Sequence, residues 1–144
     1  MKAANEMKLI LNSSSVNEGF ARVAVAAFVS RLDPTLEEIS DIKTAVSEAV
    51  TNCTVHAYPD GVGPVYITVT VIKDGRVRIK IRDVGVGIED IERAREPLFT
   101  TGGEERAGLG FAVMESFCDD VRVRSKPGKG TCVTLIKTVG ERNE

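Results

Sequence analysis

The chain has 144 residues, of which 42% are hydrophobic and 28% are charged. This length and balance predict one globular domain, residues 1–144, with a core of its own. The formal net charge of -2 argues against nucleic acid as a direct partner, because phosphate contacts need a basic face. No apolar run approaches the roughly 18 residues of a membrane span, so no membrane association is expected.

The cysteines Cys53, Cys118 and Cys132 are odd in number and far apart. Such spacing fits neither a disulfide framework nor a zinc cluster, and it predicts reduced thiols. The first twelve residues also lack the apolar centre of a signal peptide. These observations together predict a cytoplasmic protein.

The first third of the chain predicts an edge strand and two helices. Residues 8–12 are the strand candidate, and the serines at 13–15 follow as a turn and helix cap. Asp33-Pro34 predicts the cap and first position of the second helix, over residues 34–55. The predicted inward stripes are Phe20, Val23, Ala24, Ala27 and Phe28 on the first helix, over 17–32, and Leu36, Ile39, Ile42, Val46, Ala49, Val50 and Cys53 on the second.

The remainder predicts two hairpins and a third main helix. Residues 65–72 and 76–82 alternate around an Asp74-Gly75 turn, and residues 121–125 and 131–138 form the second pair. A short helix over 91–96, a loop over 98–107 and a helix over 108–118, packed through Leu109, Val113 and Phe117, lie between them. The fold class expected is an α+β two-layer sandwich with a mixed, mostly antiparallel sheet and helices on one face.

Glu48 and Asn52 are four residues apart on the second predicted helix and therefore share one face. A glutamate there is a candidate base for an attacking hydroxyl, and an amide oxygen is a ligand that Mg²⁺ accepts. A solvated helix face would carry the same two residues.

Asp83 ends an alternating strand and precedes Gly85 and Gly87. Its carboxylate is a candidate acceptor for an exocyclic amine such as that of adenine, and the glycines let backbone approach a ligand closely. A turn after the strand would explain the same residues. Gly108 and Gly110 at the start of a predicted helix offer free N–H groups suited to phosphate, although a simple loop-to-helix junction is the alternative.

Three further side chains precede that helix. Arg106 is a candidate contact for a terminal phosphate, and Thr100 and Thr101 are candidate hydroxyl donors, although a polar surface loop also explains them. The glycine pairs match neither the P-loop nor the dinucleotide-binding fingerprint, because Gly130-Thr131 precedes a strand rather than a helix.

The order of these motifs resembles the Bergerat (GHKL) ATP-binding fold shared by gyrase B, Hsp90, histidine kinases and MutL. The segments at 20–23, 47–52, 82–88, 97–101 and 110–115 narrow the resemblance to bacterial anti-sigma-factor serine kinases, and most closely to their sporulation branch. Related chains often carry a lysine after the paired threonines, whereas this chain has Gly102-Gly103, so the expected lid over the nucleotide is short and lacks lysine.

The resemblance implies a site for ATP or ADP with Mg²⁺. It implies that Glu48 is the general base, that Asn52 is the Mg²⁺ ligand and that Asp83 contacts adenine beside Thr131. Gly85 and Gly87 would shape the adenine pocket, Gly108 and Gly110 would meet the phosphates, and Arg106 would meet the γ-phosphate.

It also implies a sigma factor of the sporulation sigma F type as partner, an anti-anti-sigma protein phosphorylated on serine, and a homodimer. Asn17, Glu18 and Arg22 on the first helix are the predicted partner contacts. A stress-response anti-sigma kinase, the ATP-binding half of a histidine kinase and a sigma-binding module gated by ATP are the alternatives. The single histidine, His56, lies inside the predicted ATP domain and disfavours the second, and Glu48 disfavours the third.

Overall fold

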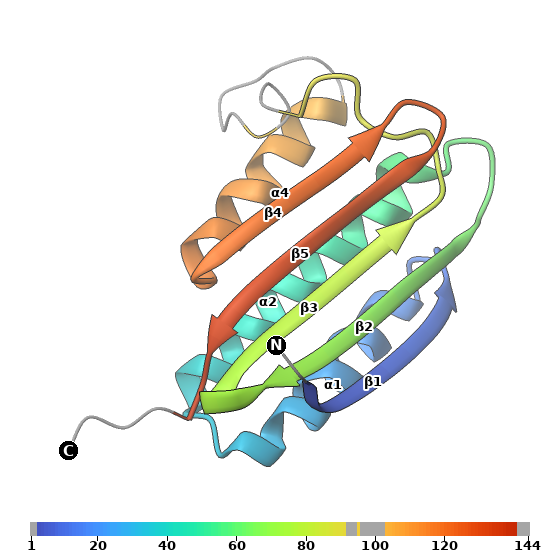
Figure 1. Cartoon of the computed structure of the whole chain (residues 1–144). Coiled ribbons are helices and arrows are strands. Elements are labelled where there is room, and N and C mark those ends of the chain that lie inside the picture. The colour runs from blue at the N-terminus through green and yellow to red at the C-terminus, as the bar shows by residue number, and fades with distance from the viewer. Residues whose placement is uncertain (1–2, 92–94, 96–102, 141–144) are drawn as a thin grey trace.

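The computed structural model describes residues 3–91, 95 and 103–140. Its described strands form one sheet in the order β1-β2-β3-β5-β4, and helices α1, α2 and α4 cover one face of that sheet (Figure 1). The predicted α+β two-layer sandwich is confirmed. All four strand pairings are antiparallel, whereas the sequence had allowed a mixed sheet. Within the described residues, no helix is long and apolar enough to cross a membrane.

The strands are longer than the sequence pattern alone indicated. Strand β1 begins at the third residue rather than the eighth and forms one edge of the sheet. The bounds are β1 Ala3–Asn12, β2 Pro64–Ile72, β3 Arg76–Asp83, β4 Asp120–Lys126 and β5 Gly130–Thr138. Both predicted hairpins are confirmed, and Asp74 and Gly75 have the positive φ values, 72° and 78°, that a tight hairpin turn requires.

The helices are α1 Asn17–Val29, α2 Leu36–Asn52 and α4 Gly103–Phe117, with short turns η1 Ser30–Leu32, η2 Cys53–Ala57 and η3 Lys73–Gly75. The predicted cap at Asp33-Pro34 is wrong. Thr35 caps α2 instead, because its hydroxyl accepts the Glu38 N–H while the Glu38 carboxylate accepts the Thr35 N–H. This reciprocal capping box also leaves Leu36 90% exposed, outside the predicted inward stripe.

The predicted inward face of α1 is wrong. Phe20 and Val23 are 56% and 53% exposed, and the buried residues are Ala21, Val25, Ala26 and Val29. The helix is apolar around most of its surface, so periodicity alone did not distinguish the two stripes. Ala21, Val25, Ala26 and Val29 face the core, where α1 packs against α2, and Phe28 packs against the same core while partly buried.

Helix α4 begins five residues earlier than the sequence predicted. The backbone of α4 begins at Gly103. The described inward side chains are Phe111 and Met114, which are 1% and 0% exposed, rather than Val113 and Phe117. The predicted short helix over 91–96 falls mostly outside the described residues.

The core lies between the sheet and the three helices. Alternate residues of the strands point into it, including Val65, Ile67, Val69, Val77, Ile79, Ile81, Val133 and Leu135, and α2 contributes Ile42, Ala45, Val46, Ala49 and Val50. The cysteines at 53, 118 and 132 are free thiols, as the sequence predicted.

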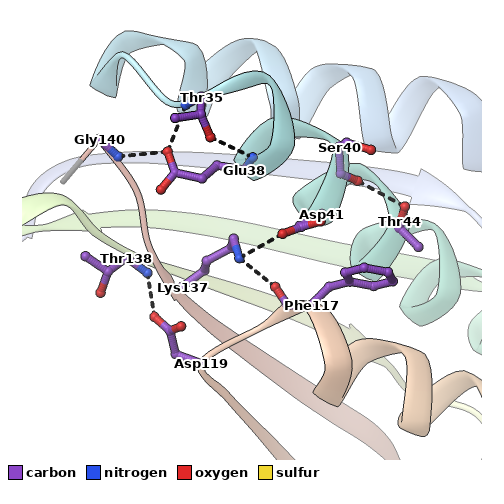
Figure 2. A network of polar contacts seen from close by, with 10 residues as sticks. All are labelled: Thr35, Glu38, Ser40, Asp41, Thr44, Phe117, Asp119, Lys137, Thr138 and Gly140. Carbon is purple, nitrogen blue, oxygen red and sulfur yellow. Dashed lines mark hydrogen bonds and ion pairs between the residues drawn. The ribbon is translucent and has the colours of Figure 1, made fainter. Parts of the chain in front are cut away.

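A polar network ties the amino-terminal half of α2 to β5 and α4 (Figure 2). The Lys137 ammonium donates to Asp41 Oδ2 at 3.3 Å and to the carbonyl oxygen of Phe117, at the end of α4, at 2.7 Å. Glu38 Oε1 also accepts the Gly140 N–H at 3.2 Å. These bonds fix the end of the sandwich where α2 begins.

Candidate functional site

A cavity of about 420 Å³ opens where α2 ends, between that helix and the carboxyl end of β3. Its walls come from α2, the π-helical turn η2, β3, the segment after β3, α4, the β4–β5 turn and β5. The lining residues are Ala49, Asn52, Cys53, His56, Ala57, Ile81, Asp83, Val86, Gly87, Ile88, Glu89, Phe111, Pro127, Thr131 and Val133. The wider π-helical turn places Cys53, His56 and Ala57 at the cavity wall rather than continuing the regular helix.

Asp83 is the buried carboxylate of this cavity, with only 5% of its surface exposed. Its Oδ1 accepts the backbone N–H of Gly85 at 3.0 Å and that of Thr131 at 3.2 Å. Its Oδ2 accepts the Cys53 thiol at 3.5 Å. One carboxylate oxygen is therefore held by two backbone donors, while the other has lone-pair capacity left for a ligand donor in the cavity.

Burial raises the pKa of the Asp83 carboxyl above its ordinary value, and the hydrogen bonds from Gly85, Cys53 and Thr131 oppose that rise. Burial, and then the neighbouring Asp83 charge, raises the pKa of the Cys53 thiol. Cys53 therefore stays protonated and serves as a donor to Asp83.

The loop after β3 is held by side chains from two other segments. The Tyr58 hydroxyl accepts the Val84 N–H at 2.8 Å and donates to the Pro64 carbonyl at 2.6 Å. The Ser125 hydroxyl accepts the Ile88 N–H at 2.7 Å and donates to the Gly130 carbonyl at 2.9 Å. These bonds fix the cavity wall on both sides of the glycine pair.

Gly85 and Gly87 are required by close approach to backbone of the same chain, whereas the sequence predicted a close approach to a ligand. A Cβ at Gly85 would collide with the Ala57 carbonyl oxygen, which accepts the neighbouring Val86 N–H at 2.9 Å. Gly87 has a φ of +77°, and a Cβ there would collide with the Lys126 carbonyl oxygen. Any larger residue at either position would displace the cavity wall.

Glu48 and Asn52 lie one turn apart on α2 and face Gly110 of α4. A Cβ placed on Gly110 would come within 3.3 Å of Glu48 Oε2 and 3.4 Å of Asn52 Oδ1. Glu48 is half-buried, and Asn52 lines the cavity that also contains Asp83. The structure thus brings Gly110 next to the Glu48 and Asn52 pair, which the sequence placed in a different motif.

The donor set suits a divalent cation that takes few protein ligands. Among the described residues there is no cluster of three or more histidine, cysteine or acidic side chains that would hold a metal by itself. Asn52 Nδ2 is buried and has no hydrogen-bond partner in the described part of the chain, so the amide keeps a free N–H donor for an acceptor on a ligand, and its oxygen is the atom that could bind a cation. One amide oxygen completed by substrate oxygens and water is a typical Mg²⁺ arrangement, and the residues present fit that ion.

Several predicted site residues are placed differently or fall outside the description. Because α4 starts at Gly103, the backbones of Arg106 and Gly108 lie within the helix, and Gly110 lies in its interior; the predicted helix start at Gly108 is wrong. The Arg106 side chain lies outside what the structure describes, as do residues Thr100 and Thr101.

The predicted partner contacts lie at the start of α1. Arg22 forms an ion pair with Glu18 at 3.3 Å, and the Asn17 amide donates to the carbonyl oxygen and side chain of Asn12 at the end of β1. Asn17 is therefore engaged with its own chain, whereas Arg22 is exposed.

Sequence reasoning missed Cys53, Tyr58, Ser125 and Phe111 as parts of the site. Cys53 had been assigned to the core stripe of α2, and its position next to Asn52 was the one available signal. The contacts of Tyr58 and Ser125 depend on how strands far apart in sequence align, which local patterns do not encode.

Comparison with known proteins agrees with this geometry. Residues 13–137 match the family model described as a histidine kinase-like ATPase domain. An anti-sigma F factor of Caldanaerobacter subterraneus subsp. tengcongensis is 54% identical over 141 residues, covering 97% of this chain and 98% of the relative. The anti-sigma F factor of Pasteuria penetrans is 57% identical over 135 residues, covering 92% of this chain and 90% of the relative.

Solved structures share the fold. A crystal structure of RsbU and RsbW domains from Mycobacterium tuberculosis superposes with a TM-score of 0.70 at 20% identity, covering 94% of this chain and 32% of the other. A histidine kinase domain from Erythrobacter litoralis gives a TM-score of 0.57 at 19% identity, covering 85% of this chain and 61% of the other. The chain belongs to the histidine kinase-like ATPase domain family and, within it, to the anti-sigma F factors.

Proposed function

We propose that this chain is an ATP-dependent protein serine kinase that inhibits a sporulation sigma factor and phosphorylates the anti-anti-sigma antagonist of that factor. The observation that carries the proposal is a cavity of about 420 Å³ lined by Asn52 and Asp83, with Glu48 beside Asn52 in front of Gly110. That volume is in the range of small-molecule sites. In this proposal the whole chain, residues 1–144, acts as one ATP-binding unit.

Asp83 would recognise the adenine. Its Oδ2 accepts a hydrogen bond from the exocyclic amine, while the backbone donors of Gly85 and Thr131 hold Oδ1 and fix the orientation of the carboxylate. Gly85 and Gly87 keep the loop close to the base. Apolar neighbours such as Ile81 and Phe111 exclude water from the same pocket and strengthen the hydrogen bond.

Glu48 would accept the proton of the attacking serine hydroxyl. Asn52, one turn further along α2, would hold Mg²⁺ through its amide oxygen, and that ion supplies charge neutralisation for the phosphates. Gly110 leaves the space in front of both side chains open, because any Cβ there would crowd the Glu48 carboxylate. Arg106, Gly108, Thr100 and Thr101 remain proposed contacts for the phosphates.

The decisive test replaces Glu48 by glutamine, which keeps its shape and removes the base. We expect unchanged ATP affinity and a loss of phosphate transfer of about 100-fold or more, the usual contribution of a positioned base. Transfer of labelled phosphate to the purified anti-anti-sigma protein, followed by mapping of the modified serine, measures the effect. Glu37→Gln, at an exposed position in the first turn of the same helix, is the matched control.

Retained transfer by Glu48→Gln would rule out Glu48 as the base. A parent protein that binds ATP and the sigma factor but transfers no phosphate would instead support a sigma-binding module gated by ATP.

Helix α1 is proposed as the contact surface for the sigma factor and for a second copy of the chain. Its outward residues Phe20 and Val23 are 56% and 53% exposed, and Val16, just before the helix, is 80% exposed; α1 also contacts the edge strand β1. Exposed apolar stripes of this kind mark protein interfaces. Arg22, exposed beside the stripe, is the proposed polar contact for the sigma factor, together with Asn17 and Glu18.

Two substitutions separate these roles. Phe20→Glu puts a charge into the stripe and should convert a dimer into a monomer, as measured by light scattering. Arg22→Ala should leave the mass unchanged and weaken binding of a purified sigma F type factor. Unchanged sigma binding by Arg22→Ala would remove Arg22 from the proposed surface.

A further inference from the structure

The face of the sheet opposite the helices is strongly basic, although the chain as a whole carries a formal charge of -2. Alternation along the strands turns every second side chain to this face, which looks toward the viewer in Figure 1. The cations on it are Lys8, Arg76, Arg78, Lys80, Arg82, Arg122, Arg124 and Lys126, and the acidic residues are Glu6 and Asp120. The net charge of the whole chain does not reveal that the cations are concentrated on this face.

The register arranges the cations in two files with β5 between them. Lys80 of β3 and Arg122 of β4 both lie opposite Thr134 of β5. Arg82 and Arg124 likewise both lie opposite Cys132. Strands are about 5 Å apart, so the two files are about 10 Å apart across a floor of shorter side chains.

We define the basic channel as Arg78, Lys80 and Arg82 on one side and Arg122, Arg124 and Lys126 on the other, with Cys132, Thr134 and Ile136 as its floor. It is hollowed at the end near the β4–β5 turn by a depression of about 230 Å³. The residues that line it are Arg82, Asp83, Arg124, Ser125, Lys126, Lys129, Gly130, Thr131 and Cys132. Arg78 Nε is buried with no hydrogen-bond partner among the described residues.

The acidic side chains of this face offset little of the charge. Asp120 pairs with Arg122 at 2.9 Å, and Glu6, on the edge strand, pairs with Lys8 at 3.9 Å. No ion pair to Lys80 or Arg124 occurs among the described residues, and both side chains are exposed. The channel thus presents cations on both sides to solvent.

We propose that the basic channel binds an extended acidic segment of a partner protein, running along β5. Within one file, side chains two residues apart on a strand recur about every 7 Å. An extended peptide has the same repeat and points successive side chains to opposite sides. Acidic residues on both sides of such a peptide would therefore meet both files at once.

The same face is poorly suited to single-stranded nucleic acid. Such sites combine a basic groove with aromatic rings on which bases stack. The aromatic side chain that the structure describes on this face, Tyr66, lies on β2 outside the channel, and the Arg82 guanidinium covers its ring at 4.2 Å. The channel floor has no ring among its described residues.

The test measures binding of fluorescein-labelled peptides to the full chain by anisotropy at low salt. Two twelve-residue peptides carry six glutamates each: one alternates Glu with Ser, and the other alternates Glu-Glu with Ser-Ser. When extended, the first places all its acids on one side and the second places three on each side. We expect the second to bind several-fold more tightly, and equal affinities would overturn the two-sided channel.

Variants then locate the binding. The pair Lys80→Gln and Arg124→Gln should weaken binding of the second peptide about tenfold, while the pair Lys43→Gln and Arg31→Gln, with the same charge loss in the helical layer, should change it less than about twofold. Equal losses in the two pairs, or no binding by the parent, would overturn the proposal. Tighter binding of a twelve-nucleotide oligothymidylate, lost in the first pair, would overturn it in favour of nucleic acid.

Discussion

Both halves of α2 carry partly buried polar side chains, but the hydrogen bonding of these side chains differs between the two halves. In the amino-terminal half, Glu38 and Asp41 bond to Thr35, Gly140 and Lys137. In the carboxyl-terminal half, Asn52 Nδ2 is buried without a partner among the described residues, and nearby Asp83 keeps an oxygen facing a cavity.

This difference separates stability from binding. A paired polar group stabilises the fold modestly, and an unpaired buried one costs free energy until a ligand satisfies it. The amino-terminal half of α2 therefore anchors the sandwich, and the carboxyl-terminal half supplies the unsatisfied groups of the proposed nucleotide site.

The strongest test of the cavity end replaces Asp83 by asparagine. The two backbone donors hold the side-chain oxygen, so the new NH₂ group faces the cavity and opposes the amine of adenine. We expect ATP affinity to fall about 10- to 100-fold, the value of a hydrogen bond to a charged group. Calorimetric titration measures the loss.

Inosine triphosphate provides the control for this substitution, because it carries a carbonyl oxygen where ATP carries the amine. Asp83→Asn should bind inosine triphosphate better than the parent does. Equal losses for both nucleotides would show that the substitution damages the pocket rather than reversing its donor pattern.

The anchored end is broken by Lys137→Met. This change keeps an apolar stem and removes the cation that Asp41 and the Phe117 carbonyl share. The side chains of Lys137 and Asp41 are only 13% and 19% exposed, so both acceptors lose their cation in a mostly buried region. We expect a loss of about 2 kcal/mol in the free energy of unfolding. Urea unfolding measures it, and Lys129→Met, in an exposed turn, is the control.

Nucleotide affinity of the folded Lys137→Met protein should be unchanged. A large fall in that affinity would contradict the separation of the two ends.

The smallest expected effect is a pH dependence at Asp83. Its pKa is raised by burial, so its contribution to stability is fully present below the ordinary value of 3.8 and is lost as pH rises through the raised pKa. Relative to the parent, Asp83→Asn should therefore become more stable as pH rises through that window. Urea unfolding of both proteins across a pH series checks the sign, and a difference that is flat with pH would contradict it.

Local features of the sequence determined much of this protein. The Asp74-Gly75 turn and the alternation of β2 and β3 predicted a hairpin. The regular apolar stripe of α2 predicted the helix that carries Glu48 and Asn52. These signals are readable because each depends on neighbours a few residues away. The glycines after Asp83 belong to the same class.

Only the tertiary structure decided the rest. Which stripe of α1 faces inward, the bond from Thr131 to Asp83 and the contact of Cys53 with the same carboxylate all join residues distant in sequence. The basic channel likewise exists only because β5 lies between β3 and β4 in the sheet, although β4 precedes β5 along the chain. Strand order and helix packing are set by the burial of the whole core, and no local pattern contains that information.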